Sequence, residues 1–195
     1  MRSSVYEVRG RRVRVKDSLR TFLSVCRLLA DDRLDVFGRM VILLPMVIEN
    51  PDGFLDAFGD ESHEALADIV WDAFSIDLTG ERAVDKAEKV IDWDEDKARI
   101  VATVRAAYTL SYDEFLDTPF NEARALIGMA PHDTPMGQAL YYRTAEPPRR
   151  TKHNKEEVER FRKMKEAYRL GKSHADNAND RATSEFDMLE RRLGR

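Results

Sequence analysis

The sequence predicts a mainly α-helical protein: a small helical domain with an N-terminal β-hairpin and a C-terminal helical extension. Three observations predict this fold. Valines alternate with basic residues around Gly10, apolar residues then recur every three or four positions, and Pro147-Pro148 precedes a charged segment. We therefore expect residues 1–148 to form the hairpin and helical body, and residues 149–195 to form a charged helical extension that is partly flexible.

Residues 5–15 predict the hairpin. Gly10 supplies the positive φ angle that a tight turn needs, and the residues after it alternate between valine and a basic side chain. A hairpin alone is only marginally stable, so it must pack on the helical body. The apolar positions of the hairpin are Val5, Tyr6, Val8, Val13 and Val15.

The spacing of apolar residues predicts the helices. For the first helix Asp17 is the expected N-cap. The second is apolar on nearly all sides after Met40, which is typical of a buried central helix, and Pro45 should kink or shorten it. Asn50-Pro51-Asp52-Gly53 predicts a turn between helices. The expected helices cover residues 18–30, 32–48, 61–74, 94–110, 119–129, 134–143 and 155–170, with a loop over 75–92 and a last amphipathic patch over 183–193.

Charge is distributed unevenly along the chain. The net charge is −4, but residues 1–20 carry +5, residues 21–144 carry −13 and residues 145–195 carry +4. The acidic body argues against a general nucleic-acid coat. The single cysteine, Cys26, excludes a disulfide framework and indicates a reducing compartment, while the longest apolar run, Met40 to Ile48, is too short to span a membrane. Because no apolar h-region follows Met1, we expect no signal peptide and an intracellular protein.

No motif with catalytic, cofactor-binding or metal-binding spacing is found in the sequence. Asp92, Asp94 and Asp96 alternate as in a calcium loop, but the required glycine and glutamate are missing, so we interpret them as the acidic start of a helix. The four histidines form no metal-binding pair. We therefore expect a non-enzymatic protein without cofactors; an enzyme with a dispersed site on the three aspartates and His132 is the weaker alternative.

A second alternative is a regulator that binds nucleic acid. The arginines of the hairpin form a basic ribbon that could contact phosphates, although a hairpin also needs a polar outer face for solubility. The acidic body would oppose such binding. The arginines concerned are Arg9, Arg11, Arg12 and Arg14.

Residues 91–144 carry a resemblance to a known family. An acidic helix start leads to an Ala-Tyr pair, then to a Leu-rich helix and a Tyr-Arg pair, and this order resembles the bacteriophage tail assembly chaperone-like family, the Listeria-phage-type small tail proteins encoded near the tape measure gene. The N-terminal hairpin and a Lys-rich late helix agree over about residues 5–170. The matching positions are Asp92, Asp94, Glu95, Asp96, Ile100, Ala106, Ala107, Tyr108, 125–127, 133–135, Tyr142, Arg143, Lys163, Lys165, Tyr168 and Leu170.

The resemblance implies a non-catalytic chaperone in the host bacterial cytoplasm that is absent from the mature virion. Its implied partners are the tape measure protein and the tail-tube protein, with self-association as a further option and no membrane contact. Family members commonly carry tryptophans where this chain has only Phe120, so the chain departs from the family pattern at this position. The apolar candidates for partner contact are Phe120, Phe161, Met164, Tyr168, Phe186, Leu189 and Leu193, although residues 158–168 would equally serve to pack the late helix on the body.

Overall fold

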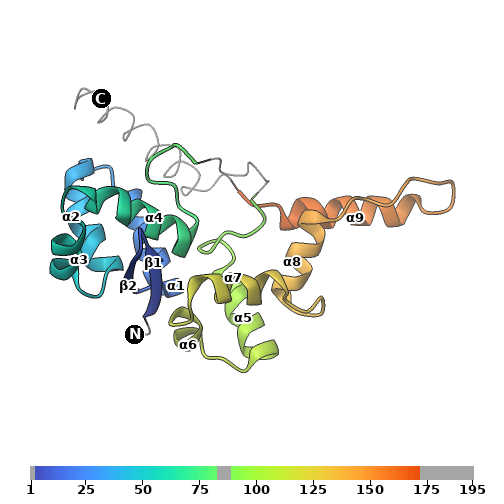
Figure 1. Cartoon of the computed structure of the whole chain (residues 1–195). Helices are drawn as coiled ribbons and strands as arrows, with labels where there is room; N and C mark the ends of the chain where they lie inside the picture. Colours follow the sequence, from blue (N-terminus) through green and yellow to red (C-terminus); the bar gives the residue numbers. More distant parts are fainter. Residues whose placement is uncertain (1–2, 83–88, 172–195) are drawn as a thin grey trace. The chain divides into compact units, whose positions relative to one another are not determined.

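The computed structural model describes residues 3–82 and 89–171, and contacts divide them into two compact units (Figure 1). Unit 1 contains residues 3–82 and 116–123, and unit 2 contains residues 89–115 and 124–171. The chain is mainly helical with an N-terminal two-stranded hairpin, which confirms the predicted fold class. Within these described ranges, no helix combines the length and the apolar character needed to cross a membrane.

The hairpin consists of β1 (Ser4–Val8) and β2 (Arg11–Val15), paired with Tyr6 opposite Val13. The turn residues Arg9 and Gly10 both have positive φ, as a two-residue type I′ turn requires. One face of the hairpin, with Val8, Val13 and Val15, is buried. This face meets the helical body because Val15 also bridges to Ile48, so the expectation that the hairpin packs on the helices is confirmed.

Unit 1 continues with α1 (Leu19–Leu29), α2 (Val36–Val47), α3 (Pro51–Phe58), a short 3₁₀ turn η1 (Gly59–Glu61) and α4 (Ser62–Phe74). The expected N-cap of α1 is wrong: Ser18 is the cap, and its hydroxyl accepts a hydrogen bond from the Thr21 amide at 3.2 Å. Asp17 is occupied elsewhere, since its carboxylate accepts from the Tyr6 hydroxyl at 3.0 Å. Burial and the neighbouring Asp17 carboxylate raise the pKa of Tyr6, so the phenol stays protonated and donates.

The predicted turn after Asn50 is instead the start of α3. The Asn50 side chain accepts from the Gly53 amide at 3.2 Å and Pro51 occupies the first helical position. Asparagine followed by proline satisfies both the N-cap and the first position of a helix, so the same residues that punctuate a turn also begin a helix.

The expectation that α2 is buried on all sides is also wrong. Phe37, Val41 and Ile42 are 77%, 57% and 40% exposed, whereas Leu43 and Val47 are buried. Pro45 lies inside the helix, which continues to Val47. Helix α2 packs on α1 by one side only, because unit 1 has no further element among the described residues that covers the other side.

Phe120 lies in the aromatic core of unit 1. Its ring stacks on Phe22 with centroids 3.9 Å apart, and the ring of Phe74 lies 6.0 Å from both. The Phe120 side chain is only 4% exposed. Partner contact through this residue stays a prediction, and it would require this cluster to open.

Unit 2 is built from α5 (Lys97–Tyr108), α6 (Tyr112–Leu116), α7 (Phe120–Gly128), α8 (Pro135–Thr144) and α9 (Lys155–Tyr168), with Leu116 and the first turn of α7 counted in unit 1. Helix α8 packs on both α5 and α9. Phe161 and Val158 of α9 are buried, and Tyr168 stacks on Tyr142 with centroids 5.4 Å apart.

The late helix therefore packs within unit 2 up to Tyr168, and the contacts do not separate it from the helices before it. Met164 and Tyr168 are half-buried, so partner contact through this stripe stays a prediction. The division after Pro148 likewise stays a prediction as a domain boundary. Phe186, Leu189, Leu193 and the expected flexible segment lie outside the described residues.

Gly137 and Gly128 give a matched test of the packing of unit 2. A Cβ atom at Gly137 would overlap the backbone carbonyl of Pro131, whereas one at Gly128 would meet no atom. We expect Gly137→Ala to lower the free energy of unfolding by about 1–3 kcal/mol, because a backbone has little room to move. Gly128→Ala should change it by less than about 1 kcal/mol.

The measurement is urea unfolding followed by tryptophan fluorescence. The chain has two tryptophans, Trp71 in unit 1 and Trp93 in unit 2, so a Trp71→Phe background reports on unit 2 alone. Equal urea midpoints for Gly137→Ala and Gly128→Ala would contradict the close approach of Gly137 in α8 to the Pro131 carbonyl in the loop before it.

Candidate functional site

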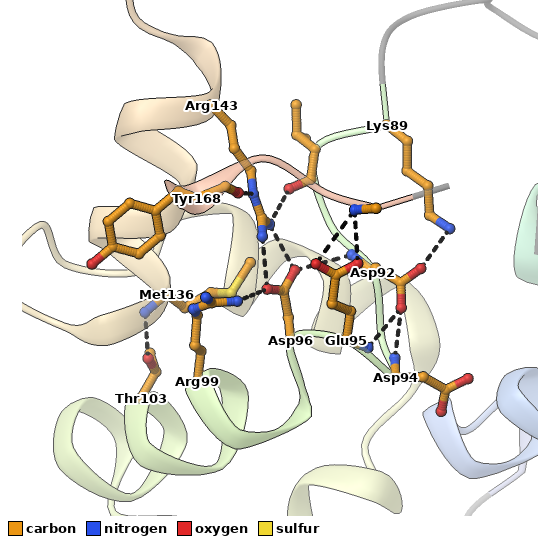
Figure 2. Close-up of polar contacts among 12 residues, drawn as sticks. Lys89, Asp92, Asp94, Glu95, Asp96, Arg99, Thr103, Met136, Arg143 and Tyr168 are labelled. Carbon is orange, nitrogen blue, oxygen red and sulfur yellow. Dashed lines mark hydrogen bonds and ion pairs between the residues drawn. The ribbon is translucent and has the colours of Figure 1, made fainter. Parts of the chain in front are cut away.

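The acidic residues that precede α5 act first as a helix start (Figure 2). One oxygen of Asp92 accepts from the backbone amides of Asp94 and Glu95 at 2.9 and 2.8 Å, and its other oxygen lies 3.0 Å from the Lys89 ammonium. Burial alone would raise the pKa of Asp92, but these hydrogen bonds and the Lys89 charge lower it. Interpreting these acids as an acidic helix start therefore agrees with their contacts.

Asp96 has a different role, because it is fully buried and ion-paired. Its two oxygens accept two hydrogen bonds from Arg143, at 2.6 and 2.8 Å, in a bidentate arrangement (Figure 2). The same carboxylate accepts from Arg99 at 2.8 Å and from the Asp92 amide at 3.1 Å. Each oxygen of this buried carboxylate thus has two donors, which is what makes its burial tolerable.

Arg143 uses its remaining donors on backbone carbonyls. Its Nε donates to the Tyr168 carbonyl at 2.6 Å and Nη1 donates to the Val90 carbonyl at 2.8 Å. Tyr168 ends α9, where a cation also meets the negative end of the helix dipole. One guanidinium on α8 therefore holds the segment before α5 and the end of α9.

The pKa of Asp96 follows from these contacts. Burial would raise it, but the hydrogen bonds and charge of Arg143, the Asp92 amide and the Arg99 hydrogen bond lower it below the usual value for aspartate. Asp96 is thus an anion whose charge is neutralised by its neighbours. An acid or base for catalysis needs a free proton-transfer position, and this carboxylate presents none.

The other groups considered for chemistry do not converge on this site. His132 is exposed and lies edge-on to the Tyr141 ring, with centroids 4.7 Å apart. No group of three or more histidine, cysteine, aspartate or glutamate side chains is placed to hold a metal ion in the part of the chain that the structure describes. The non-catalytic character of the protein stays a prediction.

The arginines of the hairpin contact groups of unit 1 itself. Arg9 lies 3.1 Å from a carboxylate oxygen of Glu61 and 3.2 Å from one of Asp68. Arg11 lies over the Phe58 ring at 5.2 Å, and Arg14 is 3.8 Å from Glu49. Arg12 stands opposite Glu7 in the strand register. Nucleic-acid binding by this ribbon stays a prediction, and it would have to compete with these intramolecular contacts.

The exposed side of α2 is the feature that the sequence analysis missed. Phe37, Val41 and Pro45 recur every four residues and share one face of the helix, with Ile42 beside them, and all four are exposed. We call these four residues the α2 apolar face. Arg39, Leu43 and Val47 recur with the same period on the opposite side and are buried. The apolar run in the sequence signalled this segment, but gave no indication of which side would stay uncovered.

Comparison with known proteins adds a family match. Residues 2–170 match the model of a family described as Bacteriophage Gp15 protein. The match spans every helix and strand that the structure describes. No curated protein and no solved structure matches the chain.

Arg143→Ala tests how strongly unit 2 depends on the buried guanidinium. The variant leaves the Asp96 carboxylate buried with half of its donors removed, so we expect a loss of about 3–5 kcal/mol in the free energy of unfolding. Arg169→Ala is the matched control, because its ion pair with Glu166 is exposed and should contribute less than about 1 kcal/mol. Trp93 fluorescence in the Trp71→Phe background measures both. Equal losses in the free energy of unfolding for the two variants would contradict the larger contribution expected from the buried ion pair.

The lowered pKa of Asp96 predicts a dependence of stability on pH. A carboxylate whose pKa is lower in the folded state stabilises the fold fully above its unfolded pKa of about 3.9. That contribution is lost as the pH falls through the lower, folded value. Asp96→Asn should therefore be less stable than the wild type at neutral pH and should lose less stability on acidification. Urea unfolding between about pH 6 and pH 2 checks this, because the loss falls below about pH 4, and parallel curves for the two proteins would contradict it.

Proposed function

Because the chain belongs to the bacteriophage Gp15 family, we propose that it is a phage tail assembly chaperone. In this proposal the protein is non-catalytic and binds the tape measure protein, the tail-tube protein, or both during tail morphogenesis. It acts in the host bacterial cytoplasm and is absent from the mature virion. The observation that carries the proposal is the α2 apolar face, an exposed stripe of large apolar side chains on a helix anchored by its other side.

An apolar stripe on a fixed helix supports binding of another helix. Residues at intervals of four on α2 match the anchor spacing of a partner helix that lies along them. Covering a large apolar side chain yields about 1.5–3 kcal/mol, so a few such contacts hold a partner without making release slow. A chaperone that must later give up its client to a growing tail tube requires this kind of moderate affinity.

The arrangement of unit 2 supports a non-catalytic role. Its buried ionisable groups, Asp96 and Arg143, are bonded to one another and to backbone groups. They serve to hold helices together, and in these contacts they present no open position toward a substrate.

Capture of tail proteins from phage-producing cells tests the proposal. The full chain carries an affinity tag, extracts are made in moderate salt, and bound proteins are identified by mass spectrometry. We expect wild-type protein to recover tape measure or tail-tube protein. The double variant Phe37→Ser/Val41→Ser should recover about tenfold less, because the polar side chains no longer gain free energy on being covered.

Met129→Ser is the matched control. Met129 is as exposed as Phe37 but lies in unit 2, so its replacement also removes an exposed apolar side chain without touching α2. Circular dichroism of each variant verifies that the fold is retained. Absence of any tail protein from the wild-type capture would refute the chaperone role. Recovery of nucleic acid that is lost on raising the salt concentration would transfer the function to the arginine hairpin.

A further inference from the structure

We propose that β1 pairs along its outer edge with β1 of a second copy of this chain, so that the two hairpins form one continuous antiparallel sheet. The inference goes beyond the proposed function, because it concerns a surface other than the α2 apolar face. It follows from the backbone hydrogen bonding of the hairpin and from the side chains that lie along β1.

Every second residue of β1 directs its backbone groups away from β2. A two-residue type I′ turn is closed by a hydrogen-bonded pair of residues, here Val8 and Arg11, and such pairs alternate along an antiparallel ladder. Tyr6 is therefore also bonded to β2. The amide and carbonyl groups of Val5 and Glu7 point outward, toward the edge of the sheet.

The opposite edge of the hairpin agrees with this alternation and is already occupied. The Arg14 carbonyl accepts from the Glu49 amide at 3.1 Å, and the Lys16 amide donates to the Val47 carbonyl at 2.8 Å. Arg14 stands opposite Val5 in the register, so the two residues direct their backbone groups away from each other. The segment after α2 thus pairs with β2, and the open edge of the sheet is that of β1.

The outward backbone groups of β1 have no partner among the residues that the structure describes. No hydrogen bond joins the amide or carbonyl of Val5 or Glu7 to any of these residues. Because buried backbone groups are almost always paired, these unpaired groups face solvent. An edge with this hydrogen-bonding pattern is a template for another strand.

The side chains along this edge fit a second copy of the same strand. Val5 is 50% exposed, whereas the other valines of the hairpin are buried. A twofold axis between two Val5 residues makes them a hydrogen-bonded pair and places Ser3 opposite Glu7 on each side of the axis. The two exposed valines then cover each other, and each carboxylate stands opposite a neutral side chain.

Charge selects this register over its neighbours. An axis between two Glu7 residues would oppose two carboxylates, which destabilises a cross-strand pair. An axis between two Tyr6 residues would place each Val5 beside a Glu7 carboxylate and leave the valines apart. A strand of another protein would need an apolar residue flanked by a neutral one to fit this edge, and β1 meets that requirement with its own residues through the symmetry axis.

This pairing uses neither the buried face of the hairpin nor the α2 apolar face. A twofold axis perpendicular to the sheet places the buried faces of both hairpins on one side and both Val5 side chains on the other. The residues that follow α2 are bonded to β2, at the edge away from the axis. Variants can therefore address the edge of β1 and the α2 apolar face separately.

Sedimentation and amide hydrogen exchange of the full-length protein test the inference. We expect a reversible equilibrium between monomer and dimer, with a dimer fraction that rises with protein concentration. The Val5 and Glu7 amides should exchange more slowly as that fraction rises, because they then donate across the axis. The Tyr6 and Val8 amides are bonded to β2 in both states, so their exchange should change little and serves as the internal control.

Two variants of Val5 locate the interface. Val5→Pro removes an outward amide without removing a bond to β2, and proline is tolerated at such edge positions. Val5→Lys opposes two ammonium groups across the axis. Each variant should raise the dissociation constant of the dimer at least about tenfold.

Val5→Thr is the matched control, because it keeps the branched side chain and the outward amide and should change the dissociation constant only a few-fold. Phe37→Ser/Val41→Ser should leave the dimer unchanged. Circular dichroism verifies that each variant retains its helices.

A protein that stays monomeric at every concentration would overturn the inference. A dimer that survives both Val5→Pro and Val5→Lys would also overturn it, and its dissociation by Phe37→Ser/Val41→Ser would assign self-association to the α2 apolar face. Slow exchange of the Val5 and Glu7 amides in the monomer would assign the edge to another segment of this chain, which likewise excludes pairing with a second copy.

Discussion

The buried guanidinium of Arg143 is the interaction on which the arrangement of unit 2 depends. It binds the fully buried Asp96 carboxylate with two hydrogen bonds and reaches the carbonyls of Val90 and Tyr168 with its other contacts. A buried charge is tolerated only when its partners stay in place. The helix that carries Arg143 is therefore held in one position relative to the start of α5 and the end of α9.

A different constraint governs unit 1: its helices have more apolar surface than the neighbouring elements cover. The hairpin, α1 and α4 bury their apolar faces, and Phe120 joins Phe22 and Phe74 in the core. Helix α2 is apolar on more sides than its neighbours can cover, so Phe37 and Val41 face solvent. Contiguous exposed apolar residues on a folded protein often mark interaction sites, and this is the physical basis for proposing a binding role for α2.

The acidic residues of unit 1 also determine what the arginines of the hairpin contact. Carboxylates of unit 1 bind Arg9 and lie close to Arg14, so much of the basic ribbon is neutralised within the protein. Residues 31–75, which include α2, contain eleven carboxylates and two arginines, so this segment is acidic overall. Composition alone would describe the hairpin as a basic surface, whereas the structure gives its arginines internal partners.

The sequence by itself determined most of the elements, because they depend on neighbours close in the chain, although α3 and α6 were not among the expected helices. The Gly10 turn, the periodicity of the helices and the proline at the start of α8 are local signals. Only the tertiary structure decided that Asp96 is buried by an arginine 47 residues away and that α2 leaves one side open. Periodicity shows which residues share a face of a helix. Whether another element covers that face depends on segments distant in sequence. A local pattern does not predict which of these segments will pack there.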